Sequence, residues 1–286
     1  DAWDLAADYR QHPLPMAARW SAELVESGPL AARIVLRTIA GLSQVRLDLV
    51  LKADSPWLEA QLSVQWQQTH ELLRLELPLN SPAVRWAADT SGGVIERPAQ
   101  AFTPFEQERW ELPVISWLAA EAEAPGGGMA VLLEGPQGVD ASANHLGVSL
   151  LRGPTWPDPS ADHGWHRHRL AFMPAQLGWN RSGVAQAAIR FREPGWVGPV
   201  ALEQRWQGLP SLPIGLVPIS VRPVKDARLS DKAVQIELLN PGPARQRWFP
   251  GTDWRLSCAA SNDRRMFWDV QPGELITVIL ENVQSS

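Results

Sequence analysis

The sequence predicts an all-β protein, a large antiparallel β-sandwich followed by a small β-sandwich domain. Apolar and polar residues alternate strictly in segments 45–51, 60–66 and 73–77, and again at 234–238. Such alternation is typical of strands that bury one face and expose the other to water. Short turn-forming motifs separate these segments, and no segment has a long helical period. Strands of this kind pack as two antiparallel sheets, face to face.

The first twenty residues bring Trp3, Asp4 and Asp8 close together. We expect a strand here that packs Trp3 into the sandwich and ends on an acidic cap. The alternative is that the two carboxylates and the indole ring face a sugar.

The alternation also predicts which side chains reach the core. In 45–51 and 73–77 the aliphatic residues share one buried face, and the polar residues between them, Asp48 and Arg74 among them, face water. Trp66 stands on an alternating apolar face, so we place it in the core. Turn motifs that contain proline separate the expected strands, at 27–29, 54–56 and 80–82.

Later segments continue the β pattern. The glycine triplet 126–128 precedes the apolar run 129–133, and no Lys-Ser or Lys-Thr pair follows it. A hairpin turn before a strand therefore explains the triplet better than a phosphate-binding loop. After a polar turn at 179–183, we expect another strand at 184–192.

The amino-acid composition of the chain changes after residue 205. Three prolines and few polar residues in 206–221 predict a stiff connector. Residues 1–205 then form the large β domain, and residues 222–286 form the small one. Within the small domain, strands are expected at 234–238 and 275–280.

The composition argues against a nucleic-acid-binding protein and a membrane-spanning protein. The 286 residues are 45% apolar and 20% charged, as in ordinary globular proteins, and the net charge of -5 provides no basic surface for nucleic acid. No apolar run approaches the ~20 residues of a membrane span. The lone cysteine, Cys258, excludes an internal disulfide and fits a reducing compartment, so we expect a cytoplasmic protein.

The stretch 143–174 holds four of the six histidines and consists of strand 146–151, a loop, and strand 165–172. Three prolines in the loop fix φ and remove backbone donors, so residues 152–162 are neither helix nor central strand. A stiff polar loop on a β scaffold is a common position for binding residues. The candidate substrate-binding residues are Arg152, Trp156, Asp158, Asp162 and His166.

The histidines of the second strand allow two interpretations. His166 and His168 share one strand face, and with Asp162 or His163 they would offer imidazole and carboxylate ligands to a metal. Two-residue spacing alone is weak evidence for a metal site. We therefore favour hydrogen-bonded residues at a strand end and predict no metal ligand.

Tryptophan is unusually abundant, with fifteen against one tyrosine and six phenylalanines. Its ring can stack on the apolar face of a sugar or fill the space between two sheets. Trp156 and Trp165 flank the loop, so they are the tryptophans we consider for sugar contact.

Several segments of the chain resemble a known family. Leu-Leu-Arg-Gly-Pro at 150–154 and Pro-Asp-Pro at 157–159 resemble the C-terminal β-sandwich region of glycoside hydrolase family 38 α-mannosidases. Segments 1–5, 26–30, 64–73 and 93–98 also resemble that family and come in its order, so the resemblance covers roughly residues 1–200. Local departures occur at two loops, with Ser-Trp-Leu-Ala at 116–119 and Pro-Gln-Gly-Val at 136–139.

The resemblance implies a galactose mutarotase-like supersandwich and a retaining glycosidase that hydrolyses terminal α-mannosidic linkages. Family members use an Asp nucleophile, an acid/base Asp, and a zinc ion held by a His-x-Asp pair with another Asp and His. This chain contains no His-x-Asp. The resemblance therefore implies a C-terminal piece, inactive alone, with no catalytic residue or cofactor of its own. The zinc and the catalytic barrel belong before Asp1.

The partners implied are the N-terminal catalytic domain, mannose-containing glycans and a second copy of the chain in a homo-oligomer. In this interpretation, Arg152 donates a forked pair of hydrogen bonds to sugar hydroxyls or a carboxylate, and Asp158 and Asp162 accept. The rival interpretation pairs Arg152 with Asp162 only to hold the loop in shape. Two other classes stay open: a non-catalytic carbohydrate-binding module, and a structural β-sandwich that closes an oligomer.

Overall fold

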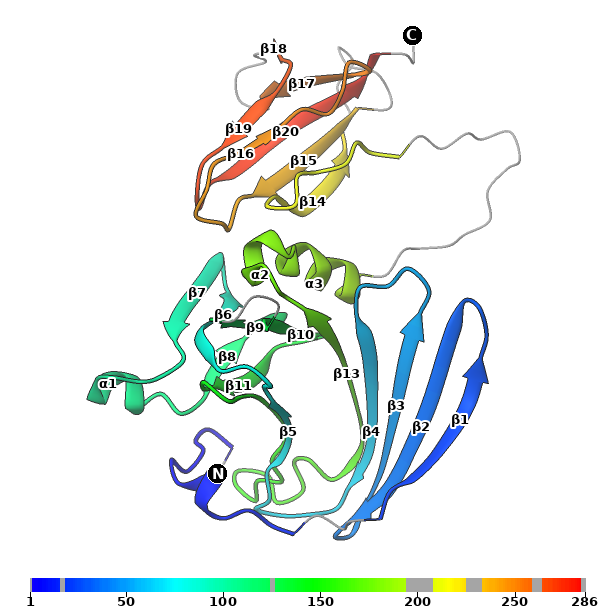
Figure 1. Ribbon diagram of the computed structural model, residues 1–286, viewed down its shortest axis with the longest axis vertical. Coiled ribbons are helices and arrows are strands. Elements are labelled where there is room, and N and C mark those ends of the chain that lie inside the picture. The colour runs from blue at the N-terminus through cyan, green and yellow to red at the C-terminus, as the bar shows by residue number, and fades with distance from the viewer. Residues whose placement is uncertain are drawn as a thin grey trace. The chain divides into compact units, whose positions relative to one another are not determined.

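The computed structural model describes residues 2–15, 19–123, 127–193, 208–224, 233–258 and 264–283. The chain divides into two compact units, Asp1–Val184 and Ala185–Ser286. Each unit is built mainly of antiparallel strands (Figure 1). The all-β prediction is therefore confirmed.

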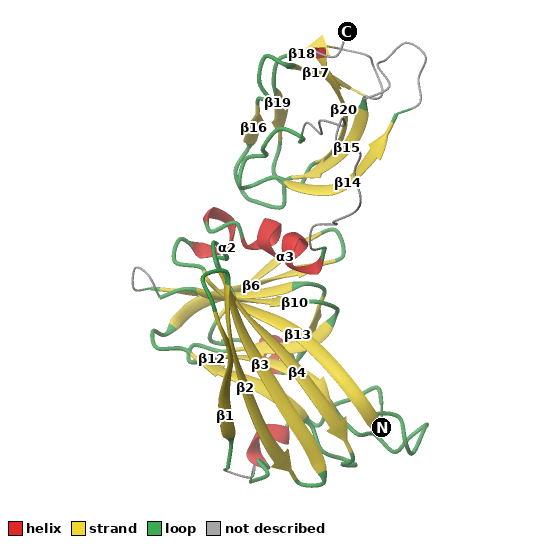
Figure 2. Cartoon of the chain, turned by 90° about the vertical axis from the view of Figure 1, so that its right-hand side faces the viewer, coloured by secondary structure: helices red, strands yellow, loops and turns green. Residues whose placement is uncertain are grey.

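The first unit contains a nine-stranded sheet in the order β1-β2-β3-β4-β13-β10-β9-β6-β7. Figure 2 shows β1 to β4 and β13 running side by side in one layer. The strands are β1 (Ser21–Ser27), β2 (Ala31–Ala40), β3 (Ser43–Lys52), β4 (Leu58–Trp66), β13 (Gly164–Pro174), β10 (Met129–Leu133), β9 (Trp117–Ala122), β6 (Ala83–Thr90) and β7 (Gly93–Pro98).

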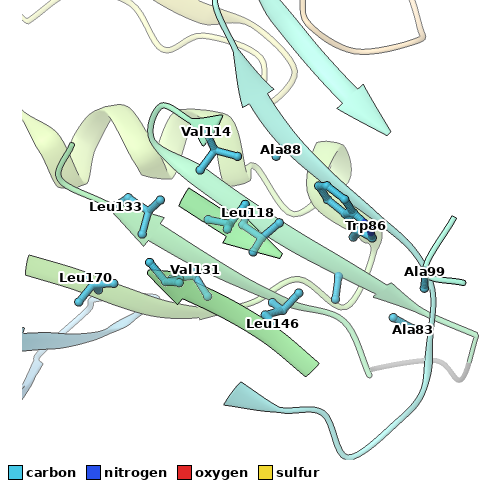
Figure 3. Packing of buried hydrophobic residues seen from close by; sticks show 13 residues of the cluster. Ala83, Trp86, Ala88, Ala99, Val114, Leu118, Val131, Leu133, Leu146 and Leu170 are labelled. Atoms are coloured by element: carbon cyan, nitrogen blue, oxygen red, sulfur yellow. The ribbon is translucent and has the colours of Figure 1, made fainter. Parts of the chain in front are cut away.

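A four-stranded sheet lies against part of the large one, with the order β5-β12-β11-β8. Its strands are β5 (Leu73–Pro78), β12 (His145–Leu151), β11 (Gln137–Ala141) and β8 (Leu112–Val114). Leu118 and Val131 of the large sheet are fully buried in one cluster with Leu146 of the small sheet (Figure 3). A second cluster packs Val64 and Trp66 of β4 against Leu151 of β12. These clusters form the core of a sandwich.

The strands predicted at 45–51, 60–66 and 73–77 correspond to β3, β4 and β5. Those predicted around the proline-rich loop are β12 and β13. The glycine triplet precedes β10, which pairs with β9 as a hairpin; Gly126 lies outside the described residues. Trp66 is buried, as expected.

The prediction that every polar residue of β3 faces water was wrong. Asp48 is only 5% exposed, whereas Leu51, on the predicted core face, is exposed. Arg46 donates two hydrogen bonds to the Asp48 carboxylate, at 2.7 and 2.8 Å, and these bonds offset the cost of burying its charge. Strict alternation does not show how far the opposing sheet extends over each strand.

The strand expected in the first twenty residues is also absent from the described part of that segment. It forms a short 3-10 helix, η1 (Tyr9–Gln11), and Trp3 is exposed. Polar contacts hold the segment instead: the indole nitrogen of Trp110 donates to the Leu5 carbonyl at 2.9 Å, and Arg10 pairs with Asp140.

Residues 184–192 are helical, which corrects the predicted strand. The helices here are α2 (Gly178–Arg181) and α3 (Val184–Arg192). The buried residues of α3 have the spacing i, i+3, i+4, i+7, which is one face of an α-helix, and alanine favours that state. These buried residues are Val184, Ala187, Ala188 and Phe191. The one other α-helix of the described chain is α1 (Pro104–Gln107).

The second unit is a small β-sandwich with its own core. One sheet runs β14 (Val217–Pro223), β15 (Val234–Leu239), β20 (Leu275–Asn282), β17 (Trp254–Cys258) and β18 (Arg264–Arg265); the other pairs β16 (Gln246–Trp248) with β19 (Trp268–Val270). Trp248, Leu256 and Leu280 are buried between them.

The first strand of this unit, β14, begins at Val217, within the stretch 206–221 that its prolines indicated as a connector. A proline such as Pro218 is tolerated because β14 lies at the edge of its sheet. Residues 194–207 lie outside the described part of the chain. None of the helices in the described segments is long and apolar enough to span a membrane.

Candidate functional site

The loop that joins β12 to β13 is closed at its base by one carboxylate. Asp162 accepts hydrogen bonds from the backbone N–H groups of Arg152, at 2.9 Å, and Gly153, at 2.8 Å. These are charge-assisted bonds, stronger than those between neutral groups. The two ends of the loop are therefore tied together through the side chain of Asp162.

A second set of contacts fixes the first half of the loop. The Gly153 carbonyl accepts from the backbone N–H of His70 at 2.7 Å, and Thr155 Oγ1 lies 2.8 Å from His70 Nε2. Gly153 has φ +57°, and a Cβ there would lie 2.5 Å from the carbonyl oxygen of Gln68. Glycine is needed for both the backbone angle and the close approach.

The outer part of the loop carries Trp156 and Asp158. The Asp158 carboxylate accepts from the backbone N–H and the hydroxyl of Ser160, at 2.9 and 3.0 Å. The backbone hydrogen bond lowers the pKa of Asp158. Trp156 is 65% exposed, so its ring faces solvent next to this turn.

Strand β13, which follows the loop, carries two histidines, His166 and His168. His166 Nε2 is 2.7 Å from the Asp162 carbonyl, and the His166 and His168 rings stack with centroids 6.4 Å apart. Burial lowers the pKa of His168, and the nearby His166 lowers it further. Within the described residues, no three His, Cys, Asp or Glu side chains are placed to hold a metal. The bond to Asp162 fits the hydrogen-bonded interpretation of His166. For His168 that prediction was wrong, because its buried Nε2 has no hydrogen-bond partner among the described residues.

Of the predicted binding residues, the structure brings Arg152, Asp162 and His166 together at the base of the loop. Trp156 and Asp158 lie in its outer half. The carboxylate of Asp162 already holds the backbone, so its contacts agree with a role in shaping the loop. Sugar binding by these five residues stays a prediction.

The structure also contains a larger polar cluster that the alternating pattern did not predict, and we call it the Arg74 network. It comprises Tyr9, Arg10, Arg74, Glu76, Glu111, Asp140, Ser142, His145 and Ser149. Arg74 of β5 donates to Glu76 at 2.8 Å and to Ser149 at 2.5 Å, and it pairs with Glu111 and Asp140. Its side chain is only 8% exposed. Arg74 was expected on a solvent-exposed face of β5, but its side chain is buried among carboxylates.

The N-terminal segment covers this network. Arg10 pairs with Asp140, and the Tyr9 ring lies over the Arg74 guanidinium, 5.0 Å from its centre. Burial alone would raise the pKa of Asp140, but a hydrogen bond from His145 and the charges of Arg74 and Arg10 together lower it. Asp140 is therefore an ionised anchor for the first residues of the chain.

Part of the network has the residue types of a hydrolase triad. His145 lies 2.7 Å from both Asp140 Oδ2 and Ser142 Oγ. However, both oxygens of Asp140 also bind arginines, and Ser142 Oγ accepts from the Asn144 N–H in the turn between β11 and β12. The arrangement is therefore one that holds a turn and a terminal segment.

One feature of the sequence could have located this network. Gly147 lies within β12, and a Cβ there would overlap both Arg74 and Asp140. A glycine inside a strand often marks the close approach of another group. The alternating pattern alone does not show which group approaches.

The profile of the glycosyl hydrolases family 38 C-terminal domain matches residues 1–160. The chain belongs to glycosyl hydrolase family 38. The match covers both sheets up to β12 and residues 152–160 of the candidate loop, so the family resemblance noted in the sequence is confirmed.

The curated relatives that this family 38 chain matches include proteins named alpha-mannosidases. It is 28% identical to human alpha-mannosidase 2C1 over 197 residues, which is 68% of this chain and 19% of that protein. It is 27% identical to alpha-mannosidase G of Dictyostelium discoideum over 179 residues, 61% of this chain and 16% of that one. The chain thus spans about a fifth of the length of the curated relatives it matches.

The fold also has a solved counterpart. An alpha-mannosidase from Enterococcus faecalis V583 superposes with a TM-score of 0.67 and 13% identity, over 92% of this chain and 35% of that one. At this identity the likeness supports the fold, and it extends beyond residue 160 to most of the chain.

Proposed function

We propose that this chain is the C-terminal part of an α-mannosidase that hydrolyses terminal α-mannosidic linkages with retention of configuration. The observation that carries the proposal is the family 38 match over residues 1–160, together with relatives that are named alpha-mannosidases. Because the chain spans about a fifth of such a relative, the whole activity belongs to a longer protein.

The catalytic groups are assigned to a domain that precedes residue 1 in that longer protein. A retaining glycosidase needs two carboxylates about 5–5.5 Å apart across the scissile bond. The sequence has no His-x-Asp, and the described residues offer no group of three metal ligands, so this chain does not fit the expected zinc site. We propose that the zinc and both catalytic carboxylates lie in the preceding domain, and that this chain alone is inactive.

The role proposed for the chain is to support the substrate cleft and to pack against the catalytic domain. Asp162, Gly153 and Thr155 hold the loop in one shape. Arg152, Trp156, Asp158 and His166 are the residues proposed to face mannose-containing glycans, and Arg152 would supply a forked donor. The lone Cys258 supports a cytoplasmic location for the enzyme.

The proposal is tested with the full-length protein and an aryl α-mannoside. We expect hydrolysis, an α-configured first product by NMR, loss of activity on chelation and its return with zinc. The matched aryl β-mannoside is the control and should not be hydrolysed. A full-length protein that binds mannosides without cleaving either substrate would favour the carbohydrate-binding module instead.

The isolated chain gives a second test. It should neither hydrolyse the α-mannoside nor retain stoichiometric zinc after dialysis. One tightly held zinc per chain would contradict the assignment of the metal to another domain.

A further inference from the structure

A basic cleft of about 620 Å³ lies over β2, β3, β4 and β13, and we call it the outer cleft. Its lining includes Arg19, Arg37, Gln44, Arg46, Ser63 and Trp165. The alternation of β3 and β4 directs Arg46 and Ser63 to the face opposite Val45 and Val64, which lie in the core. The outer cleft is thus on the outer face of the sandwich.

Strand register explains why these side chains meet. Trp165 pairs with Gln65 across β13 and β4, and Gln65 pairs with Gln44 across β4 and β3. In the next row, Ser63 pairs with Arg46, which pairs with Arg37. Neighbouring strands are about 4.8 Å apart, so the two arginines stand side by side, and the aromatic ring lies within about 15 Å of them.

The arginines of the outer cleft and the two carboxylates that pair with them leave an excess of one positive charge. Three arginines and no carboxylate belong to its lining. Arg46 is held by Asp48 at 2.7 Å and Arg37 by Glu23 at 3.0 Å, whereas Arg19 has no ion-pair partner among the residues that the structure describes. Guanidinium groups match carboxylate, sulfate and phosphate oxygens in pairs.

The neutral part of the lining has a different chemistry. Trp165 is 66% exposed, so its ring is open to solvent. The amide of Gln44 and the hydroxyl of Ser63 supply both donors and acceptors beside it. An aromatic face next to such groups can stack on a sugar ring and bind its hydroxyls.

We propose that the outer cleft binds a saccharide that carries an anionic substituent, with the sugar ring on Trp165 and the anion at the arginines. The outer cleft is separate from the candidate site. Trp165 lines the cleft and His166 belongs to the site; they are adjacent in β13, and adjacent side chains of a strand point to opposite faces of the sheet. The proposal does not depend on the mannosidase assignment, since its readout is binding.

The test uses two ligands that differ only in charge. β1,4-linked mannuronate and mannose tetrasaccharides have the same stereochemistry, with a carboxylate or a hydroxymethyl group at C6. We measure their binding to the full-length protein by calorimetry at low and high salt. The uronate should bind about tenfold more tightly or better, and salt should weaken it. Equal affinities would overturn the proposal.

Variants locate the site. Trp165→Ala and Arg37→Gln should each lower uronate affinity about tenfold or more, corresponding to one stacking contact or one charged bond. The controls are Phe102→Ala, another exposed aromatic residue, and Arg85→Gln, an exposed arginine paired with Glu121 at 3.0 Å. Melting temperatures verify that each variant is folded. Unchanged affinity in Trp165→Ala would contradict a sugar stacked there.

Competition experiments distinguish recognition of an anionic saccharide from recognition of an anion alone. A sulfated or phosphorylated monosaccharide should displace the uronate, and inorganic phosphate should displace it only at far higher concentration. If phosphate or a non-saccharide polyanion competes as well as the sugars do, the cleft recognises charge alone and the proposal fails.

Discussion

The Arg74 network and the loop 152–163 are two polar clusters of the first unit that use charge in opposite ways. In the network, Arg74 is buried and pairs with several carboxylates. In the loop, Asp158 and Asp162 bind backbone N–H groups, and Trp156 faces solvent. Charged side chains that pair with one another hold the fold, whereas this loop is held through its backbone and exposes the ring of Trp156 to solvent. The network should therefore control stability and the loop should control activity.

The largest effect is expected from breaking the network. Arg74→Ala removes a partner that the half-buried Glu111 and Asp140 share, and Asp140 keeps only Arg10 and His145, so the free energy of unfolding should fall by about 3 kcal/mol. Chemical denaturation followed by tryptophan fluorescence measures this change.

Arg85→Ala is the matched control for the network. Arg85 also pairs with a glutamate, at 3.0 Å, but its side chain is 52% exposed. Its removal should cost about 1 kcal/mol or less, because exposed ion pairs contribute little. Similar losses in both variants would show that the burial of Arg74 has no special importance.

An intermediate effect is expected at the loop. Asp162→Ala removes the acceptor of two backbone N–H groups, and the free energy of unfolding should fall by about 1–3 kcal/mol. Hydrogen exchange should increase at the amides of Arg152 and Gly153 more than elsewhere. Unchanged exchange at these amides would contradict the role of Asp162 in closing the loop.

Acid should weaken the Arg74 network through protonation of Asp140. The folded-state pKa of Asp140 is lowered, so its contribution is complete above the unfolded pKa of about 3.9 and disappears as pH falls through the folded value. We expect the stability of Asp140→Asn to change less between pH 5 and pH 2 than that of the parent. An identical pH slope in both proteins would exclude Asp140 as a source of the effect.

Sequence alone predicted the strands well because burial of one face produces alternation, as in β3, β4 and β5. It missed the burial of Arg74, since alternation within β5 carries no information about the N-terminal segment that folds over it. The helix α3 was missed because two of its four buried residues are alanines, which mark a helical face only weakly. The loop was located through its prolines and family motifs, but the backbone role of Asp162 depends on a fold that neither feature reveals.

The smallest effect on stability, and the most direct test of the contrast, comes from Arg152→Ala in the full-length protein. Melting temperature and kcat/KM for an aryl α-mannoside are measured on the same preparation. If the loop serves the substrate, kcat/KM should fall about tenfold or more, as for loss of a charged hydrogen bond, and the melting temperature should stay unchanged. A lower melting temperature with normal kcat/KM for the folded enzyme would contradict this account and make the loop, like the Arg74 network, a structural element.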